Sequence, residues 1–198
     1  RSVIMTTVSG TNIGEVPDII DAAVAAGANV FAFGRYCPTS EEKDVGIKPL
    51  RYRQLLETCD KKFKAYEAAG CQTYFNKKDH LWTLYEYETG EFKIPSWAEE
   101  GMIYGGCNCG NCHLTILPTG DVYACRRVQN SRVGNVFEDR LADLWVTKLE
   151  DYRDYRKFKK CSKCELLAFC RGCPAVASGR DGNFYPADPQ CWKEIDAS

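Results

Sequence analysis

The hydrophobic pattern at the start of the chain predicts strands and a helix in alternation. Val3–Val8 is a run rich in β-branched residues that ends at the turn-forming stretch Ser9–Asn12, which predicts a buried strand. Apolar residues then recur at helical spacing between Pro17 and Gly27, and Asn29–Phe33 predicts a second strand. Together these elements predict a βαβ unit of a parallel sheet or barrel. One such unit cannot bury both faces of its sheet, so we expect partner strands from an upstream segment or from another subunit.

A long helix and an aromatic region follow this unit. Pro49 opens a helical pattern that runs to about Ala69, and Cys71 begins a short apolar stretch that predicts a strand. Residues 79–104 are rich in aromatic side chains, and their first half is compatible with a helix or with a hairpin. The aromatic side chains could line a peptide groove, although packing within a small domain is the more common reason for such density.

The pattern of the C-terminal half predicts a hairpin and a further helix. From Leu114 the alternation of apolar and polar residues predicts a hairpin whose turn lies at Pro118–Asp121. Residues 141–155 repeat apolar side chains every three to four positions, which predicts an amphipathic helix running directly into Cys161. Lys148–Lys163 carries seven basic side chains against three acidic ones, which indicates either a solvated helix face or compensation for anionic groups nearby.

Composition and charge narrow the class of protein. The chain has 198 residues, of which 44% are hydrophobic, enough for an ordinary globular core. Its 26 Lys and Arg residues balance 27 Asp and Glu residues, so charge gives no support for a nucleic-acid or anionic membrane partner. No apolar run approaches the ~18 residues of a spanning helix, and no signal peptide opens the chain. We expect a cytoplasmic protein and, because it begins at Arg1 without a methionine, a fragment.

The candidate chemistry lies in the cysteines, of which there are twelve. Cys37, Cys59 and Cys71 are interpreted as structural, although Cys37 follows the second predicted strand and could also contact a substrate. The other nine fall within the last 92 residues at spacings typical of metal sites: Cys107, Cys109, Cys112, Cys125, Cys161, Cys164, Cys170, Cys173 and Cys191.

Three uses of these cysteines compete. A disulfide framework is the device of short secreted chains that lack a core, and this chain is long enough to build one. Metal ligation in a reducing compartment is therefore the better interpretation. Zinc and iron–sulfur clusters both take four thiolates from Cys-x2-Cys pairs, so spacing alone does not choose between them.

The order of the cysteines resembles the SPASM domain of radical S-adenosylmethionine enzymes. That signature is a cysteine, a gap, Gly-x4-Cys, then Cys-x2-Cys-x5-Cys-x3-Cys and one further cysteine. Here Cys107 is followed by Gly120 and Cys125, then by the group that runs from Cys161 to Cys173, and then by Cys191. The N-terminal βαβ unit is similar to the end of that family's partial (β/α)6 barrel.

The resemblance implies a fold class and a domain plan. The fold would be α/β plus α+β, a partial TIM-like barrel followed by a small cysteine-rich domain with a β-hairpin and helices. Residues 1–70 would end the barrel, 71–106 would bridge, and 107–198 would form the SPASM domain.

The same resemblance implies two auxiliary [4Fe–4S] clusters. The first would be held by Cys107, Cys125 and Cys173, with either Cys109 or Cys112 as the fourth ligand. The second would be held by Cys161, Cys164, Cys170 and Cys191. Because Cys173 would cross back to the first cluster while Cys191 closes the second, the two sites would be tied together.

The chain departs from the family pattern in three ways. The gap before Cys173 is two residues, Arg171–Gly172, where the family has three. The Cys107–Cys112 run offers one cysteine too many, which leaves open an iron that accepts a substrate thiol. The family's catalytic Cys-x3-Cys-x2-Cys motif does not occur in this sequence. We therefore expect the C-terminal portion of a longer enzyme.

In the complete enzyme, a third [4Fe–4S] cluster and S-adenosylmethionine would generate the radical, and a flavodoxin or ferredoxin would donate electrons. The resemblance favours a ribosomally made precursor peptide as substrate, crosslinked for example as a cysteine thioether. Maturation of a sulfatase, another enzyme or a peptide-derived redox cofactor comes next, and a non-catalytic electron-transfer or zinc module is the alternative from another class. Asn12 and Arg35 follow predicted strands and could bind cofactor at the barrel rim, although turn capping or a salt bridge explains them equally well.

Overall fold

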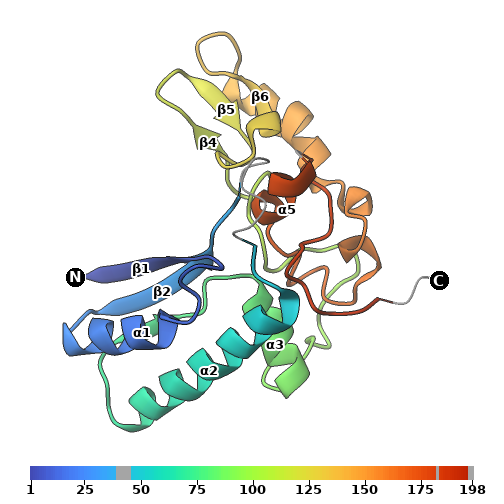
Figure 1. Ribbon diagram of the computed structural model, residues 1–198. Helices are drawn as coiled ribbons and strands as arrows, with labels where there is room; N and C mark the ends of the chain where they lie inside the picture. Colours follow the sequence, from blue (N-terminus) through green and yellow to red (C-terminus); the bar gives the residue numbers. More distant parts are fainter. Residues whose placement is uncertain (39–45, 182, 196–198) are drawn as a thin grey trace. The chain divides into compact units, whose positions relative to one another are not determined.

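The chain forms two compact units (Figure 1). The computed structural model describes residues 1–38, 46–181 and 183–195. Of these residues, the first unit takes 1–36, 46–93 and 190–193, and the second takes 37–38, 94–181, 183–189 and 194–195. In the described part of the chain, no helix is long and apolar enough to cross a membrane.

The first unit contains a three-stranded parallel sheet in the order β1-β2-β3. Its strands are β1 (Val3–Val8), β2 (Val30–Arg35) and β3 (Tyr74–Asn76), and Val3 of β1 lies opposite Val30 of β2. The predicted βαβ unit is confirmed, with the second strand extending two residues beyond its expected end. The strand expected from Cys71 is shorter than predicted and begins at Tyr74.

Three helices complete the first unit. They are α1 (Val16–Ala25), α2 (Pro49–Ala68) and α3 (Leu81–Thr89). The first two confirm the predicted helices, and α3 decides between the two structures considered for the aromatic region. Gly27 adopts a positive φ of 67° directly after α1, a conformation that glycine reaches without steric cost.

The core of the first unit lies between β2 and the helices. Phe31 and Phe33 are both fully buried, and the ring of Phe63 from α2 stacks on Phe75 of β3 at a centroid distance of 4.4 Å. In contrast, β1 alternates, and its side chains Val3 and Met5 remain 58% and 48% exposed. Figure 1 shows α1 and α2 on one side of the sheet, so the described part of the first unit covers only one face at β1.

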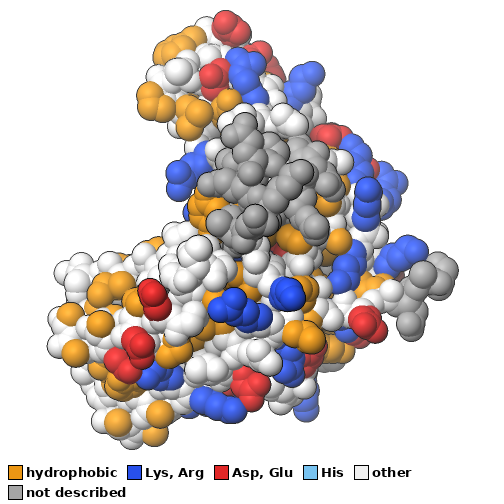
Figure 2. Space-filling view, in the orientation of Figure 1, with side chains coloured by type: hydrophobic (Ala, Val, Ile, Leu, Met, Phe, Trp, Pro, Cys, Tyr) orange, Lys and Arg blue, Asp and Glu red, His pale blue; other side chains and the backbone are white. Residues whose placement is uncertain are grey.

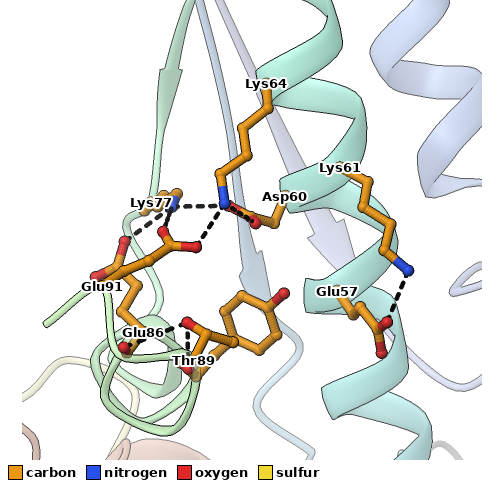
Figure 3. A network of polar contacts seen from close by, with 9 residues as sticks. Glu57, Asp60, Lys61, Lys64, Lys77, Glu86, Thr89 and Glu91 are labelled. Atoms are coloured by element: carbon orange, nitrogen blue, oxygen red, sulfur yellow. Dashed lines mark hydrogen bonds and ion pairs between the residues drawn. The ribbon is translucent and has the colours of Figure 1, made fainter.

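An ionic network joins α2 to the segment that carries β3 and α3 (Figure 3). The buried carboxylate of Asp60 accepts hydrogen bonds from Lys64 Nζ at 2.6 Å and from Lys77 Nζ at 3.0 Å. Lys77 also donates to Glu86 Oε1 at 2.8 Å. Burial alone would raise the pKa of Asp60, but the two lysines outweigh it and hold that pKa below its usual value.

The second unit is built on a small antiparallel sheet. It contains β4 (Thr115–Ile116), β5 (Asp121–Tyr123) and β6 (Arg132–Asn135) in sequential order. The predicted hairpin is confirmed, with its turn between β4 and β5, whereas β6 was not predicted. Helix α5 (Pro174–Asp181), which the sequence pattern did not indicate, follows the last of the grouped cysteines.

The single amphipathic helix predicted over residues 141–155 is wrong. The segment forms a short helix, α4 (Leu141–Asp143), a π-helical turn at Leu144–Lys148 and a 3₁₀ turn at Leu149–Arg153. Tertiary contacts explain the break: the Arg153 guanidinium donates to the backbone carbonyls of Trp145 at 2.6 Å and Gly110 at 2.9 Å. A cysteine-bearing loop thus binds this segment where a regular helix was expected.

Replacing Asp60 with asparagine should destabilise the first unit by about 1–3 kcal/mol, because the two lysines lose a buried, charged acceptor. In the wild type, this contribution is present above the unfolded aspartate pKa of about 4 and is lost as pH falls through the lower pKa of the folded state. Hydrogen exchange of the α2 amides, measured against pH, tests both statements. Glu57→Gln is the control, since the Glu57–Lys61 pair is solvent-exposed, and equal losses in both variants would contradict the prediction.

Candidate metal centre

The Cys107–Cys112 run folds into a tight loop that separates its three cysteines. The backbone N–H groups of Asn111, Cys112 and His113 all donate to the carbonyl of Asn108, at 3.0–3.1 Å. Gly110 has a positive φ of 72°, and a Cβ at this position would lie 2.6 Å from Cβ of Tyr152. The loop buries Cys107, half-buries Cys109 and leaves Cys112 exposed.

Cys107 and Cys109 lie close to Cys125, which follows strand β5 by two residues. The Cys109 thiol hydrogen-bonds to Cys107 and to Cys125, and these contacts, together with burial, raise its pKa. The hydrogen bond from Cys109 is also the main reason why the pKa of Cys125 falls to about 7. Three sulfur atoms from two separate loops therefore converge, and Cys112 shows no such contact among the described interactions.

The backbone around Cys125 is fixed by a buried hydroxyl. Ser131 Oγ accepts a hydrogen bond from the Cys125 N–H at 3.1 Å, and it lies 2.9 Å from the Cys125 carbonyl and 2.7 Å from the Val128 carbonyl, either of which can accept its proton. Ser131 is completely buried directly before β6. Ser131, which the sequence analysis did not single out, thus holds the Cys125 turn in place from the turn directly before β6.

Cys173 joins the same region through a short connection that contains Gly172. Gly172 has a positive φ of 61°, and the Cys173 N–H donates to Asp188 Oδ2 at 2.8 Å. Cys109, Cys161 and Cys173 all pack on one buried core that contains Cys125, Val128, Phe158, Ala175 and Phe184. The gap of two residues before Cys173 therefore still delivers it to the core shared with Cys109 and Cys125.

The second predicted ligand set lies on consecutive turns. The Cys164 N–H donates to the Cys161 carbonyl at 3.0 Å, and the Cys170 N–H donates to the Leu166 carbonyl at 2.7 Å. Cys161, Cys164 and Cys170 therefore lie on neighbouring turns of one segment. Cys191 belongs to the segment 190–193 of the first unit, so its membership of this set stays a prediction.

Within the residues that the structure describes, no three or more Cys, His, Asp or Glu side chains are arranged to hold a single metal ion. An iron–sulfur cubane takes one thiolate at each iron, so its ligands need not meet at one point. Five thiols around one small core suit that kind of group.

Comparison with protein families decides the nature of this part of the chain. Residues 107–174 match the model of SPASM, an iron–sulfur cluster-binding domain. Residues 107–174 form a SPASM domain. This confirms the recognition made from the cysteine order, and the matched range contains every predicted cluster ligand except Cys191.

Solved structures share the fold of the chain. Streptococcus suis SuiB bound to S-adenosylmethionine matches with a TM-score of 0.66 and 20% identity, over 96% of this chain and 45% of SuiB. SuiB bound to precursor peptide SuiA matches with a TM-score of 0.63 and 19% identity, over 96% and 44%. AnSMEcpe with bound AdoMet and the Kp18Cys peptide matches with a TM-score of 0.64 and 18% identity, over 95% and 52%.

The chain therefore spans about half the length of these structures. No curated protein matches it in sequence. At these identities the likeness shows a shared fold of mixed helix and sheet.

Two side chains that the sequence analysis missed surround Cys107 in the SPASM domain. Arg171 is buried and donates to the Cys107 carbonyl at 2.5 Å and to the Leu167 carbonyl at 3.2 Å, which joins the two cysteine-bearing segments. Its guanidinium lies 5.0 Å from the ring centroid of Tyr155. No local spacing marks Arg171, because it binds a backbone carbonyl 64 residues away in the sequence.

Tyr155 provides a test of whether an iron–sulfur group fits. Its hydroxyl is buried and has no hydrogen-bond partner among the described residues. Burial chiefly raises the pKa of Tyr155, and the nearby thiols of Cys107 and Cys112 raise it further. This buried phenol lies beside thiols and lacks a hydrogen-bond acceptor. The sulfide of a cluster could be that acceptor. The residues present fit such a group.

Basic side chains in the segment 148–163 of the SPASM domain pair in part with acidic residues of the same segment, Arg156 with Asp154 and Lys157 with Asp151. On the face shown in Figure 2, Lys and Arg side chains gather over the short helical turns of the second unit. These turns replace the predicted helix, so the first interpretation, one solvated helix face, does not hold in that form. Compensation for anionic clusters, the second interpretation, stays a prediction.

A groove of about 1030 Å³ opens on the SPASM domain between residues 94–103 and 147–169. Its apolar lining includes Ile94, Met102 and Phe169, and its acidic lining includes Glu99, Glu100 and Glu150. Tyr104 stacks on Phe169 at a centroid distance of 5.5 Å. Among the described lining residues, none is an aromatic side chain of residues 79–104, so the contacts of this region support packing, the more common reason considered from the sequence.

Asn12 and Arg35 make internal contacts in the first unit. The Asn12 side chain accepts from the Ser9 N–H at 2.8 Å and donates to the Thr7 carbonyl at 3.0 Å. Arg35 is buried, pairs with Asp79 at 2.8 Å and donates to Gln190 at 2.9 Å. These are the contacts of a turn cap and a salt bridge, and a role of either residue in cofactor binding stays a prediction.

Replacing Gly172 with alanine should reduce the iron content of the SPASM domain. Alanine costs about 1–2 kcal/mol at positive φ, and its Cβ would lie 2.6 Å from Cβ of Asp188, the side chain that holds the Cys173 N–H. Iron per chain after anaerobic purification is the measurement. Gly27→Ala is the matched control, because Gly27 has a similar φ but no atom within 4 Å of its Cβ position. Equal iron in both variants would contradict the proposed constraint on Cys173.

Proposed function

We propose that this chain is the C-terminal part of a radical S-adenosylmethionine enzyme that modifies a ribosomally made precursor peptide. The observation that carries the proposal is the convergence of Cys107, Cys109 and Cys125 from two loops within a SPASM domain. The fold shared with SuiB and anSMEcpe, which were solved with S-adenosylmethionine and with peptides, supports it.

In this proposal the domain holds two auxiliary [4Fe–4S] clusters. The first takes Cys107, Cys109, Cys125 and Cys173. Cys109 is preferred to Cys112 because its thiol touches two other members of the set, whereas Cys112 is exposed. The second takes Cys161, Cys164, Cys170 and Cys191. When bound, the clusters would supply an electron acceptor, or a site of ligation, for the substrate.

The protein's own side chains have separate roles in this arrangement. Arg171 fixes the loop of Cys107 to the segment before Cys173, and Asp188 fixes the backbone of Cys173 itself. The buried hydroxyl of Tyr155 would donate to the first cluster and raise its potential, because a donated hydrogen bond stabilises the more negative, reduced state.

The remaining parts follow the same plan. Residues 1–70 would end a partial (β/α)6 barrel, 71–106 would bridge, and 107–198 would hold the clusters. A third [4Fe–4S] cluster, S-adenosylmethionine and an electron donor such as flavodoxin or ferredoxin would belong to the complete enzyme. The groove lined by Ile94, Met102 and Phe169 is a candidate site for the peptide, and a cysteine thioether is the favoured product.

The proposal predicts about eight irons and eight sulfides per chain after anaerobic purification, with broad visible absorption. Cys164→Ala should lose about half of the iron. Cys59→Ala should lose none, because Cys59 is buried in the first unit, where burial raises its pKa to about 12. A colourless protein with about two zinc ions would instead indicate a structural zinc module and overturn the proposal.

A further inference from the structure

One cysteine outside the predicted ligand set lies in the same region as the first set. Cys37 follows β2 by two residues, and by its contacts it belongs to the second unit. It packs on the core that contains Cys125, where Cys109 and Cys173 also pack. It is half-buried, as both of those cysteines are. Cys59 and Cys71 belong to the first unit.

Arg127 links Cys37 to the predicted ligands. Its Nη1 donates to the Cys37 sulfur at 3.5 Å, a distance typical of a hydrogen bond to sulfur. Arg127 is two residues after Cys125, and the charges of Cys37, Cys173 and Cys125 all act on its guanidinium. One cation therefore faces three sulfur atoms, which is favourable if all three lie beside an anionic cluster.

The number of thiols then exceeds what one cluster needs. A [4Fe–4S] cluster takes four thiolates. Cys161 also packs on this core but belongs to the second predicted set. The other cysteines of this region number five: Cys37, Cys107, Cys109, Cys125 and Cys173. The family signature accounts for Cys107, Cys125 and Cys173 but leaves the fourth ligand open. Cys37 and Cys109 are the two described thiols of this region that remain for one iron.

We infer that Cys37 is an alternative ligand to the fourth iron of the first cluster, exchanging with Cys109. The inference rests on the proposed presence of that cluster. In the exchange, the Cys37 thiol gives up its proton as its sulfur binds iron, and Cys109 takes up a proton as its sulfur leaves. The charge and oxidation state of the cluster do not change. Arg127 stabilises the Cys37 sulfur while it carries negative charge.

An exchangeable ligand gives the fourth iron a property that the other three lack. A substrate thiol could bind this iron in place of the protein thiol. Before and after that, Cys37 or Cys109 would bind the iron and keep the cluster intact. The sequence left open an iron that accepts a substrate thiol, and Cys37 would protect that iron from loss.

The test compares single and double substitutions in anaerobically purified chain, by electron paramagnetic resonance and iron analysis. Cys37→Ala and Cys109→Ala should each keep the first cluster with four irons, because the other thiol serves. The double variant should lose one iron and show the paramagnetic signal of an oxidised three-iron cluster, whereas the oxidised four-iron cluster is silent. This readout does not depend on catalytic activity.

Two further double variants control for other thiols. Cys109→Ala combined with Cys112→Ala, or with Cys71→Ala, should keep four irons. A three-iron signal in Cys109→Ala alone, or its absence from the Cys37/Cys109 double variant, overturns the inference. Such results leave the proposed function standing as long as the wild-type chain holds about eight irons. A wild-type chain without iron overturns both.

Discussion

The second unit depends on bringing thiols from distant parts of the chain to one small core. The position of a cysteine sulfur depends closely on its own backbone, because the side chain is short and has a single rotatable bond. The backbone at each cysteine must therefore be fixed. The protein does this with side chains that bind backbone groups: Ser131 at Cys125, Arg171 at Cys107 and Asp188 at Cys173. Each such bond replaces one that a regular helix or strand would have supplied.

This device explains why the second unit has so little regular structure. Short strands and single turns leave carbonyls and amides available to distant partners, as when Arg153 takes up the carbonyls of Trp145 and Gly110. The cost is a small apolar core, in which cysteines occupy positions that a larger domain would give to leucine or valine. In the proposed cluster-bound form, the cluster would add to the stability of this unit, because the binding free energy is also folding free energy.

The sequence predicted the elements whose stability is local and failed where distant contacts decide. The periodicity of α1 and α2 and the β-branched run of β1 were sufficient, because one face of each element packs on its neighbour. The apolar repeat at 141–155 is equally regular, yet Arg153 and the Gly110 loop break it. Cysteine spacing indicated a metal site, but choosing Cys109 over Cys112 required the loop geometry. The role proposed for Cys37 has no counterpart in the cysteine spacing, because 70 residues separate it from Cys107.

The first unit has an exposed apolar surface at its strand β1. Strand β2 is buried along its length, whereas Val3 and Met5 of β1 are about half exposed, and in the described structure β1 pairs with β2 alone. An apolar, unpaired strand edge is a site where another strand can add, from the same chain or from another one. Strand β2 ends at Arg35, and Asn12 lies four residues after the end of β1; their side chains make salt-bridge and turn contacts. Within the described residues, the second unit therefore contains eight of the nine predicted ligand cysteines, and the first unit contains Cys191.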